Sequence, residues 1–268
     1  MTSKAFEAVL SEPDEVAACS RLYALITTRN FSSASLPTVA EKYLHAFCDS
    51  ASSTIRRRWI GLALAAMMGA SDAVAQRLSK LNPQIQGVGA AIISDTEREE
   101  TKVVAGLILR QALDRGLEYN SFWSSNKVKD SAPNFPREAD RNWMKKFQVF
   151  LDTLGDLALA NPTTDPSIIF PVSVVTSDGL SWPQSNDGTI LALIQAGMLT
   201  VIVTDGQLRH LSFLDTPLNS IRHMQSGPST HIESQVRSTE HEPWDLVLTL
   251  KVNSWTYSVD TTDRKSVV

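Results

Sequence analysis

Apolar and polar residues alternate most clearly near the C-terminus of the sequence. Apolar side chains occupy every second position from Trp244 to Val252, and a second such run follows Asn253-Ser254. A period of two is typical of a strand with one buried face. With Asn253-Ser254 as a two-residue turn, apolar residues of the two runs face each other: Val252 and Trp255, Leu250 and Tyr257, Leu248 and Val259. The pattern predicts a β-hairpin over 244–259.

Further apolar runs extend this β-rich region towards the N-terminus. The predicted strands cover 168–176, 189–195, 198–204, 218–224 and 231–237. Asp205-Gly206 is a hairpin turn signal. The apolar pairs Val201–Leu211 and Leu199–Phe213 then require a three-residue loop or a bulge. Together with the hairpin, these runs give roughly seven strands, which is enough for a small barrel or sandwich.

The first 160 residues follow the period that marks amphipathic helices. Helix starts are predicted where a capping residue precedes an apolar-periodic stretch, at Ser11, Ser35, 52–54 and Asp95. The last of these helices should end at Gly116, because glycine favours the position after a helix. Other helices are predicted over 71–82 and 137–160, and the segment 84–94 stays ambiguous because its glycines weaken a helical pattern.

The most apolar run of the sequence, 59–70, predicts a buried helix. It is shorter than the ~20 apolar residues that cross a bilayer. Gly61, Gly69 and the alanines between them offer little side-chain bulk, which allows neighbouring helices to approach closely. We expect this helix to lie at the centre of a helical bundle.

Asn161-Pro162-Thr163-Thr164-Asp165-Pro166 divides the chain, because two prolines cannot continue a helix. The sequence therefore predicts an α+β protein with an α-helical domain (1–160), a linker (161–166) and an antiparallel β-domain (167–268). The successive helices resemble, in layout only, a helical-repeat stack of the HEAT or armadillo type.

Charge and cysteine content narrow the function classes. Residues 1–160 carry 19 Lys and Arg against 18 Asp and Glu, a net charge of +1, whereas 161–268 carry 6 against 11, a net charge of −5. The acidic half favours a basic partner over nucleic acid or anionic lipid. Cys19 and Cys48 both fall in predicted helices, and the first residues lack a secretory signal, which favours an intracellular protein.

No motif predicts catalysis, a cofactor or a metal. The histidines show no zinc-ligand spacing, and the glycines form no nucleotide-binding loop. His45 and Cys48 lie one helical turn apart, but a buried structural cysteine is the favoured interpretation over a nucleophile with its base. We therefore assign no catalytic, cofactor-binding or metal-binding residue.

Two groups of residues are candidates for contacts with another protein. Arg56-Arg57-Arg58 spread around a helix, so they cannot all bind one partner; the favoured interpretation is a solvated helix end, and the alternative is a contact with phosphate or an acidic partner. The second group is Tyr119, Phe122 and Trp123 with Lys127 and Lys129. It is either packed at the end of the stack, which is favoured, or an exposed anchor.

The C-terminal part, 166–268, resembles a pleckstrin-homology-like domain. The resemblance rests on the strand Met198 to Thr204, the turn Asp205-Gly206, the segment 214–221 and the hairpin 244–259. Two features depart from that family. Only 261–268 remain for the helix that normally closes the barrel, and 176–189 contain no Lys or Arg for phosphoinositides.

A helical-repeat domain followed directly by such a β-domain is similar to the N-terminal region of meiotic chromosome-axis proteins of the synaptonemal-complex type. The β-domain alone also resembles the middle domains of histone chaperones. These resemblances imply a non-enzymatic interaction scaffold in the nucleus, associated with chromatin, that binds other proteins. The alternatives are a membrane-proximal signalling adaptor and an enzyme whose site combines His210, His223 and Asp205. The oligomeric state stays open.

Overall fold

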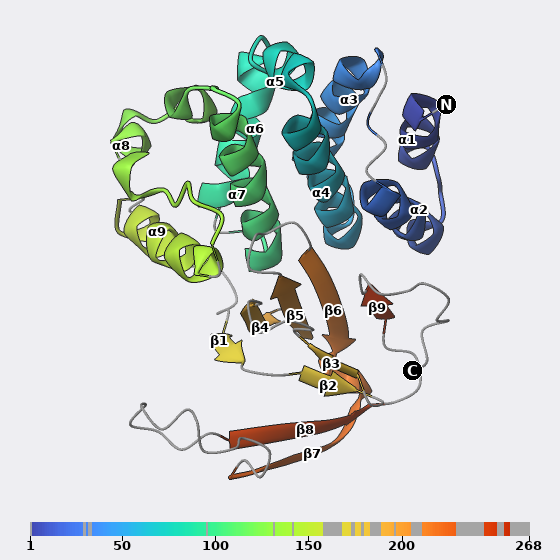
Figure 1. Cartoon of the computed structure of the whole chain (residues 1–268). Helices are drawn as coiled ribbons and strands as arrows, with labels where there is room; N and C mark the ends of the chain where they lie inside the picture. Colours follow the sequence, from blue (N-terminus) through green and yellow to red (C-terminus); the bar gives the residue numbers. More distant parts are fainter. Residues whose placement is uncertain are drawn as a thin grey trace.

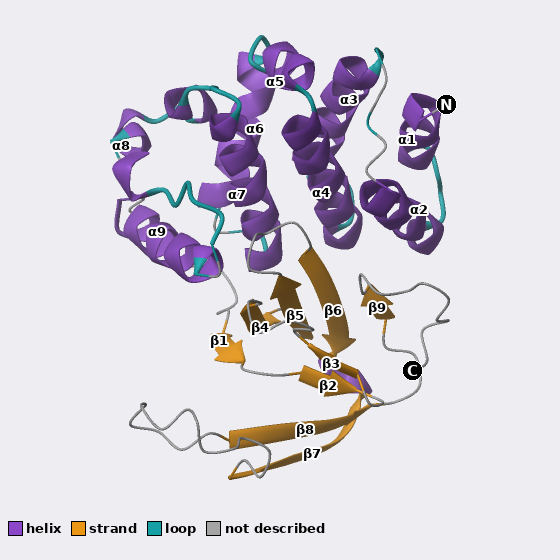
Figure 2. Cartoon of the chain, viewed as in Figure 1, coloured by secondary structure: helices purple, strands orange, loops and turns teal. Residues whose placement is uncertain are grey.

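The fold is that of an α+β protein, with a helical part followed by a β part (Figure 1). A computed structural model covers all 268 residues, and the residues that it describes are 2–28, 31, 34–94, 96–130, 132–140, 142–157, 168–172, 175–177, 180–182, 189–195, 197–204, 211–228, 244–250 and 255–257. The predicted linker 161–166 lies outside these residues. In Figures 1 and 2 the helices form one layer and the five-stranded sheet lies against its lower end.

The helical part consists of α-helices joined by short turns. Their bounds are α1 Thr2–Leu10, α2 Glu15–Thr28, α3 Leu36–Cys48, α4 Thr54–Ala70, α5 Asp72–Leu78, α6 Asn82–Ile93, α7 Glu99–Asp114, α8 Asn126–Lys129 and α9 Trp143–Leu157, with 3-10 turns η1 Tyr119–Phe122 and η2 Ala132–Asn134. The starts predicted at Ser35 and 52–54 are confirmed, and the ambiguous segment 84–94 is helical. Gly116 follows α7 with a φ of 83°, as a glycine after a helix end commonly does.

Several helix boundaries differ from the prediction. The helix expected to start at Asp95 begins at Glu99, with Arg98 at the N-cap position, and the helix predicted over 71–82 ends at Leu78. The side chain that caps α2 belongs to Asp14 and not to Ser11, since Asp14 Oδ1 accepts a hydrogen bond from the Ala17 amide at 2.9 Å. The helix predicted from residue 137 begins only at Trp143. The indole of Trp143 donates instead to the Pro136 carbonyl at 2.8 Å, which holds the preceding segment against the helix as a loop.

Helix α4 lies at the centre of the helical part, as its small residues predicted. It packs against α2, α3, α5 and α7, and ten of its residues are buried. A Cβ atom added at Gly61 would lie 2.5 Å from Val104 Cγ1 on α7 and 2.8 Å from the Phe47 ring on α3. Glycine at this position therefore lets three helices meet in one place.

The strands form one larger antiparallel sheet and two pairs. Their bounds are β1 Ile168–Val172, β2 Val175–Ser177, β3 Leu180–Trp182, β4 Thr189–Gln195, β5 Met198–Thr204, β6 Leu211–Pro217, β7 Ile221–Pro228, β8 Trp244–Leu250 and β9 Trp255–Tyr257. Among the described residues the five-stranded sheet has the order β1-β4-β5-β6-β9, while β2 pairs with β3 and β7 with β8.

Several strand predictions are confirmed and others are wrong. The predicted strands 189–195 and 198–204 are β4 and β5. The predicted strand 168–176 is instead divided between β1 and β2, and 218–224 begins with a 3-10 turn, Leu218–Ser220, before β7. The predicted strand 231–237 lies outside the described residues.

The predicted register after Asp205-Gly206 is also wrong. Val201 pairs with Leu214, and Leu199 pairs with Thr216, which shifts β6 by three residues from the expected pairing. The last pair of this ladder is Thr204–Leu211. Six residues therefore connect the two strands, twice as many as predicted.

The described strands β8 and β9 do not pair with each other as the hairpin predicted over 244–259 requires. Strand β8 pairs with β7, where Leu250 lies opposite Ile221. Strand β9 pairs with β6, where Tyr257 lies opposite Phe213. The alternation identified both strands correctly, but each strand has a more distant partner than its sequence neighbour. Local apolar matching does not choose between partners when several strands carry the same pattern.

One face of the five-stranded sheet packs against the helices. Leu193, Ile202, Leu211 and Phe213 belong to the same buried cluster as the helical core. Strand register places Thr200 opposite both Leu193 and Asp215, so these residues share that face. Ala192, Leu199 and Val201 occupy alternate positions on the other face and are also buried. Asp215 is therefore a charged residue within the apolar face of the sheet that packs against the helices.

We predict that Gly61→Ala lowers the free energy of unfolding by about 1–3 kcal/mol, because the new methyl group overpacks a closed core. Gly69→Ala is the matched control in the same helix. Its Cβ would meet first the end of the flexible Gln111 side chain, at 2.9 Å from Oε1, so the gain in helix propensity should leave stability unchanged or raised. Urea denaturation followed by circular dichroism measures both; equal effects would contradict the close packing around Gly61.

Candidate functional site

The three arginines at the start of α4 point to three different elements. Ser53 caps the helix, since its hydroxyl oxygen accepts from the Arg56 amide at 3.2 Å. The Arg56 guanidinium donates to the carbonyls of Val9 and Leu10 at 3.0 and 2.9 Å. These carbonyls end α1, where a helix has unsatisfied acceptors and a partial negative charge. Arg56 therefore binds the C-terminus of α1 to α4.

Arg57 makes the corresponding contact with α3. Its Nε donates to the Phe47 carbonyl at 2.9 Å, near the end of that helix. Its Nη1 donates to Glu97 Oε1 at 2.6 Å, just before α7 begins. The guanidinium also lies 5.7 Å from the centroid of the Phe47 ring. One side chain thus joins α4, the end of α3 and the segment that precedes α7, and it is 5% exposed.

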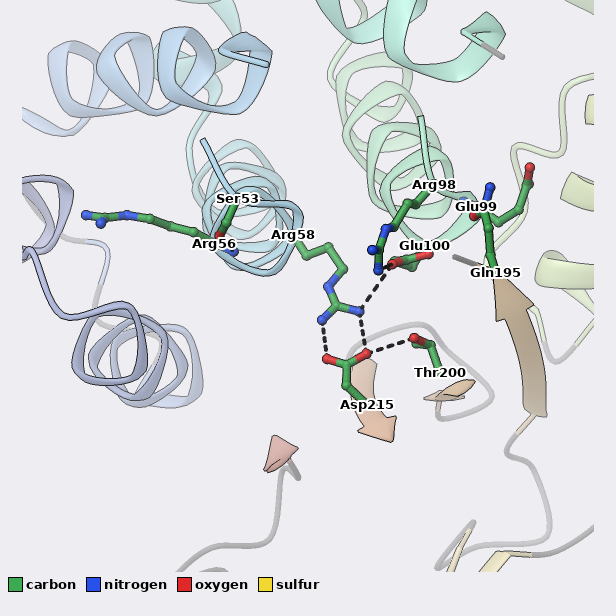
Figure 3. A network of polar contacts seen from close by, with 9 residues as sticks. All are labelled: Ser53, Arg56, Arg58, Arg98, Glu99, Glu100, Gln195, Thr200 and Asp215. Carbon is green, nitrogen blue, oxygen red and sulfur yellow. Dashed lines mark hydrogen bonds and ion pairs between the residues drawn. The ribbon is translucent and has the colours of Figure 1, made fainter. Parts of the chain in front are cut away.

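Arg58 reaches the sheet and is fully buried (Figure 3). Its Nη1 donates to Asp215 Oδ1 at 3.1 Å, and its Nη2 forms a second, shorter contact with Oδ2 of the same carboxylate. Thr200 on β5 donates to Asp215 Oδ1 at 2.8 Å. The Phe213 ring lies beneath the guanidinium, 4.4 Å from its central carbon. A bidentate pair is among the strongest polar contacts in proteins, and here it joins residues 157 positions apart.

A second carboxylate, that of Glu100 on α7, lies beside the same guanidinium. Glu100 Oε1 is 3.8 Å from Arg58 and 3.6 Å from Arg98. Burial raises the pKa of Glu100, and the negative charge of Asp215 raises it further, while Arg58 and Arg98 oppose the shift. This carboxyl group therefore takes up a proton more readily than an exposed glutamate does.

Another contact joins the sheet to α7. The amide of Glu99, the first residue of that helix, donates to Gln195 Oε1 on β4 at 3.4 Å. The first amides of a helix lack partners within it, so the sheet supplies one. We name the set of Arg58, Arg98, Glu100, Thr200 and Asp215 the junction cluster.

The candidate residues in the arginine triplet have different outcomes. Their interpretation as a solvated helix end is wrong for Arg57 and Arg58, because both side chains are buried. The expectation that the triplet cannot bind a single partner is confirmed by its three separate contacts. The contacts described above are all made within the chain, and two of the arginines pair with acidic side chains: Arg57 with Glu97, and Arg58 with Asp215.

The aromatic candidates form part of the core. Tyr119, Phe122 and Trp123 are 5%, 0% and 2% exposed, so they do not form an exposed anchor. Their packing is close, since a Cβ added at Gly89 on α6 would collide with the Phe122 carbonyl oxygen. Lys129 Nζ donates to Asn126 Oδ1 at 3.1 Å. The Lys127 side chain lies outside the described part of the structure.

Among the described residues that were weighed for chemistry, His45 and Cys48 show no nucleophile–base contact. His45 is exposed, whereas Cys48 Sγ lies 3.7 Å from the Gln84 carbonyl. Burial raises the pKa of Cys48 to about 11 and that of Cys19 to about 12, which opposes a nucleophilic thiolate. His223 is in β7 opposite Thr249, and Asp205 and His210 lie outside the described residues.

The described residues contain no group of three His, Cys, Asp or Glu side chains placed to hold a metal ion. They also contain no helix with the length and apolar character needed to cross a bilayer.

Sequence reasoning identified Arg58 but missed the rest of the junction cluster. One signal was present: Asp215 follows Leu211 and Phe213 at intervals of two, which places an acid on the apolar face of a strand. A buried acid requires a buried cation. Thr200 gives a weaker signal in the same way, since it interrupts an apolar strand.

Comparisons with protein-family models, with curated proteins and with solved structures find no match. The interpretation of the site therefore rests on its geometry.

We predict that Asp215→Asn lowers the free energy of unfolding by about 3–5 kcal/mol, because it removes the carboxylate that pairs bidentately with the buried Arg58 guanidinium. The control is Glu7→Gln, which breaks the exposed pair of Glu7 with Lys42, 2.7 Å apart. That change should cost less than about 1 kcal/mol. Chemical denaturation measures both variants, and similar losses would show that Arg58 does not depend on Asp215.

We predict that Glu100→Gln raises the free energy of unfolding at neutral pH and that the gain shrinks as the pH falls. The pKa of Glu100 is raised in the folded state, so the native protein binds the proton more tightly than the unfolded chain, and this stabilising contribution is lost as the pH rises through the raised pKa. Glutamine has no such dependence. Urea denaturation from pH 4 to pH 8 tests this; a constant difference between the two proteins would contradict it.

Proposed function

We propose that this protein is a non-enzymatic protein–protein interaction scaffold. The observation that carries the proposal is that charged side chains inside the protein bind other elements of the same chain. The arginine triplet and the junction cluster hold α1, α3, α4, α7 and the sheet to one another. The polar groups of these side chains hold elements of the chain in place. This is expected of a protein whose function is to present a surface of fixed shape to other proteins.

The raised thiol pKa values support the same proposal. A nucleophilic cysteine needs a pKa lowered by nearby positive charge, whereas burial raises that of both thiols, to about 12 and about 11. Both cysteines therefore contribute to packing in the helical array.

We interpret the helical part as similar to a HEAT or armadillo-type stack, and the β part as pleckstrin-homology-like. Support comes from consecutive helices that pack side by side and from an antiparallel sheet that follows them in the chain. This order of parts is the basis for proposing a nuclear, chromatin-associated role.

Crosslinking affinity purification with mass spectrometry tests the proposal. The tagged full chain should recover chromatin or DNA-processing proteins, and a fluorescent fusion should enter the nucleus. Asp215→Asn is the matched variant, because it replaces one buried carboxylate with an amide. It should reduce recovery if the partner-binding surface includes both the helical part and the β part. Recovery of chaperones alone from both proteins would contradict the scaffold.

A further inference from the structure

We propose that the α4–α7 end of the helical part is a binding site for an extended segment with an aromatic residue two positions before an acid, and that β6 occupies this site within the same chain. The inference rests on the proposed scaffold function and names the chemistry of its partner. Recognition depends on Phe213 and Asp215, which stand on the same face of β6 and both contact Arg58.

The helical part supplies the receptor side of this contact. Arg58 comes from α4 near its capped N-terminus, and Arg98 immediately precedes α7. In Figure 3 both guanidinium groups lie on the side of these helices that faces the sheet. The positive ends of two helix dipoles also lie at this end. A carboxylate is the group that such an arrangement favours.

The β6 strand supplies the ligand side. Arg58 binds the carboxylate with a planar fork, and the Phe213 ring covers the guanidinium at 4.4 Å. Bidentate pairing fixes the direction of the carboxylate, while a cation–π contact prefers an aromatic ring over an aliphatic side chain. An aromatic residue two positions before an acid can therefore cover the face of one guanidinium while the acid binds its N–H groups.

The charge of the two parts agrees with this assignment. The β part, 161–268, carries a net charge of −5, against +1 for residues 1–160. Its acidic composition predicted a basic partner, and Arg58 is one such partner within the chain. A segment from another protein must displace β6 in order to bind. Strand β6 has the advantage in this competition because it is covalently attached to the site. The site is therefore closed until competition or a change in charge weakens the junction.

The test uses the full-length chain and a fluorescent peptide of residues 211–217, Leu-Ser-Phe-Leu-Asp-Thr-Pro. In Asp215→Arg, two like charges face each other and the sheet should leave Arg58. Fluorescence anisotropy should show at least tenfold tighter peptide binding to this variant than to the wild type. Peptides with Asn in place of the acid or Ala in place of the aromatic residue should lose the gain.

The matched control is Arg58→Asp combined with Asp215→Arg, which restores a pair of opposite charges and removes the receptor arginine. It should bind the peptide no better than the wild type does. Equal affinity of Asp215→Arg and the wild type would overturn the proposal. Circular dichroism checks folding; if Asp215→Arg loses its helical signal, Asp215→Ala replaces it, and loss of that signal in both variants also overturns the proposal.

The outcome is independent of the scaffold experiment. Peptide binding without recovery of chromatin proteins would support the site and contradict the proposed function. Recovery of those proteins without peptide binding would support the proposed function and contradict the site, since partners would then use another surface.

Discussion

A buried guanidinium without a carboxylate is too costly to keep, and this constraint determines how the two parts of the protein fit together. Arg58 is fully buried on the central helix, so the chain must bring an acid to it. Asp215 comes from β6, the fourth strand in the order β1-β4-β5-β6-β9, 157 residues later in the chain. Apolar surfaces tolerate sliding, but a bidentate pair does not. We therefore interpret the pair as the contact that fixes the position of the sheet on the helices.

Arg56 and Arg57, which precede Arg58 in α4, bind the ends of other helices. A helix end leaves carbonyl groups without partners, and a nearby cation satisfies them. Arg56 does this for α1 and Arg57 for α3. Arg115 repeats the device elsewhere, where its guanidinium binds the Gly69 carbonyl near the end of α4 and Asp72 on α5. The helical part thus depends on arginines at helix ends as well as on its apolar core.

The sequence revealed local elements better than their partners. The helix start at Thr54 follows from the Ser53 cap and that at Leu36 from Pro37 in the first turn, and β4 and β5 follow from apolar runs between turn residues. These features depend on neighbouring residues. The pairing of β8 with β7, and of Arg58 with Asp215, joins segments far apart, where many apolar strands and several acids compete for each partner. Burial of Arg57 and Arg58 was missed for the same reason, since no local signal distinguishes a buried arginine from a solvated one.

The two thiols have a practical consequence for following motion in solution. Cys19 lies in α2 with no exposed surface, whereas Cys48 ends α3 beside α6 and is partly exposed. A thiol-specific reagent reacts with the thiolate, and burial raises the pKa of both thiols, so each becomes more reactive when its surroundings open. The rate of labelling at each position then reports how often that part of the helical array opens. The natural sequence thus carries two separate reporters of local opening.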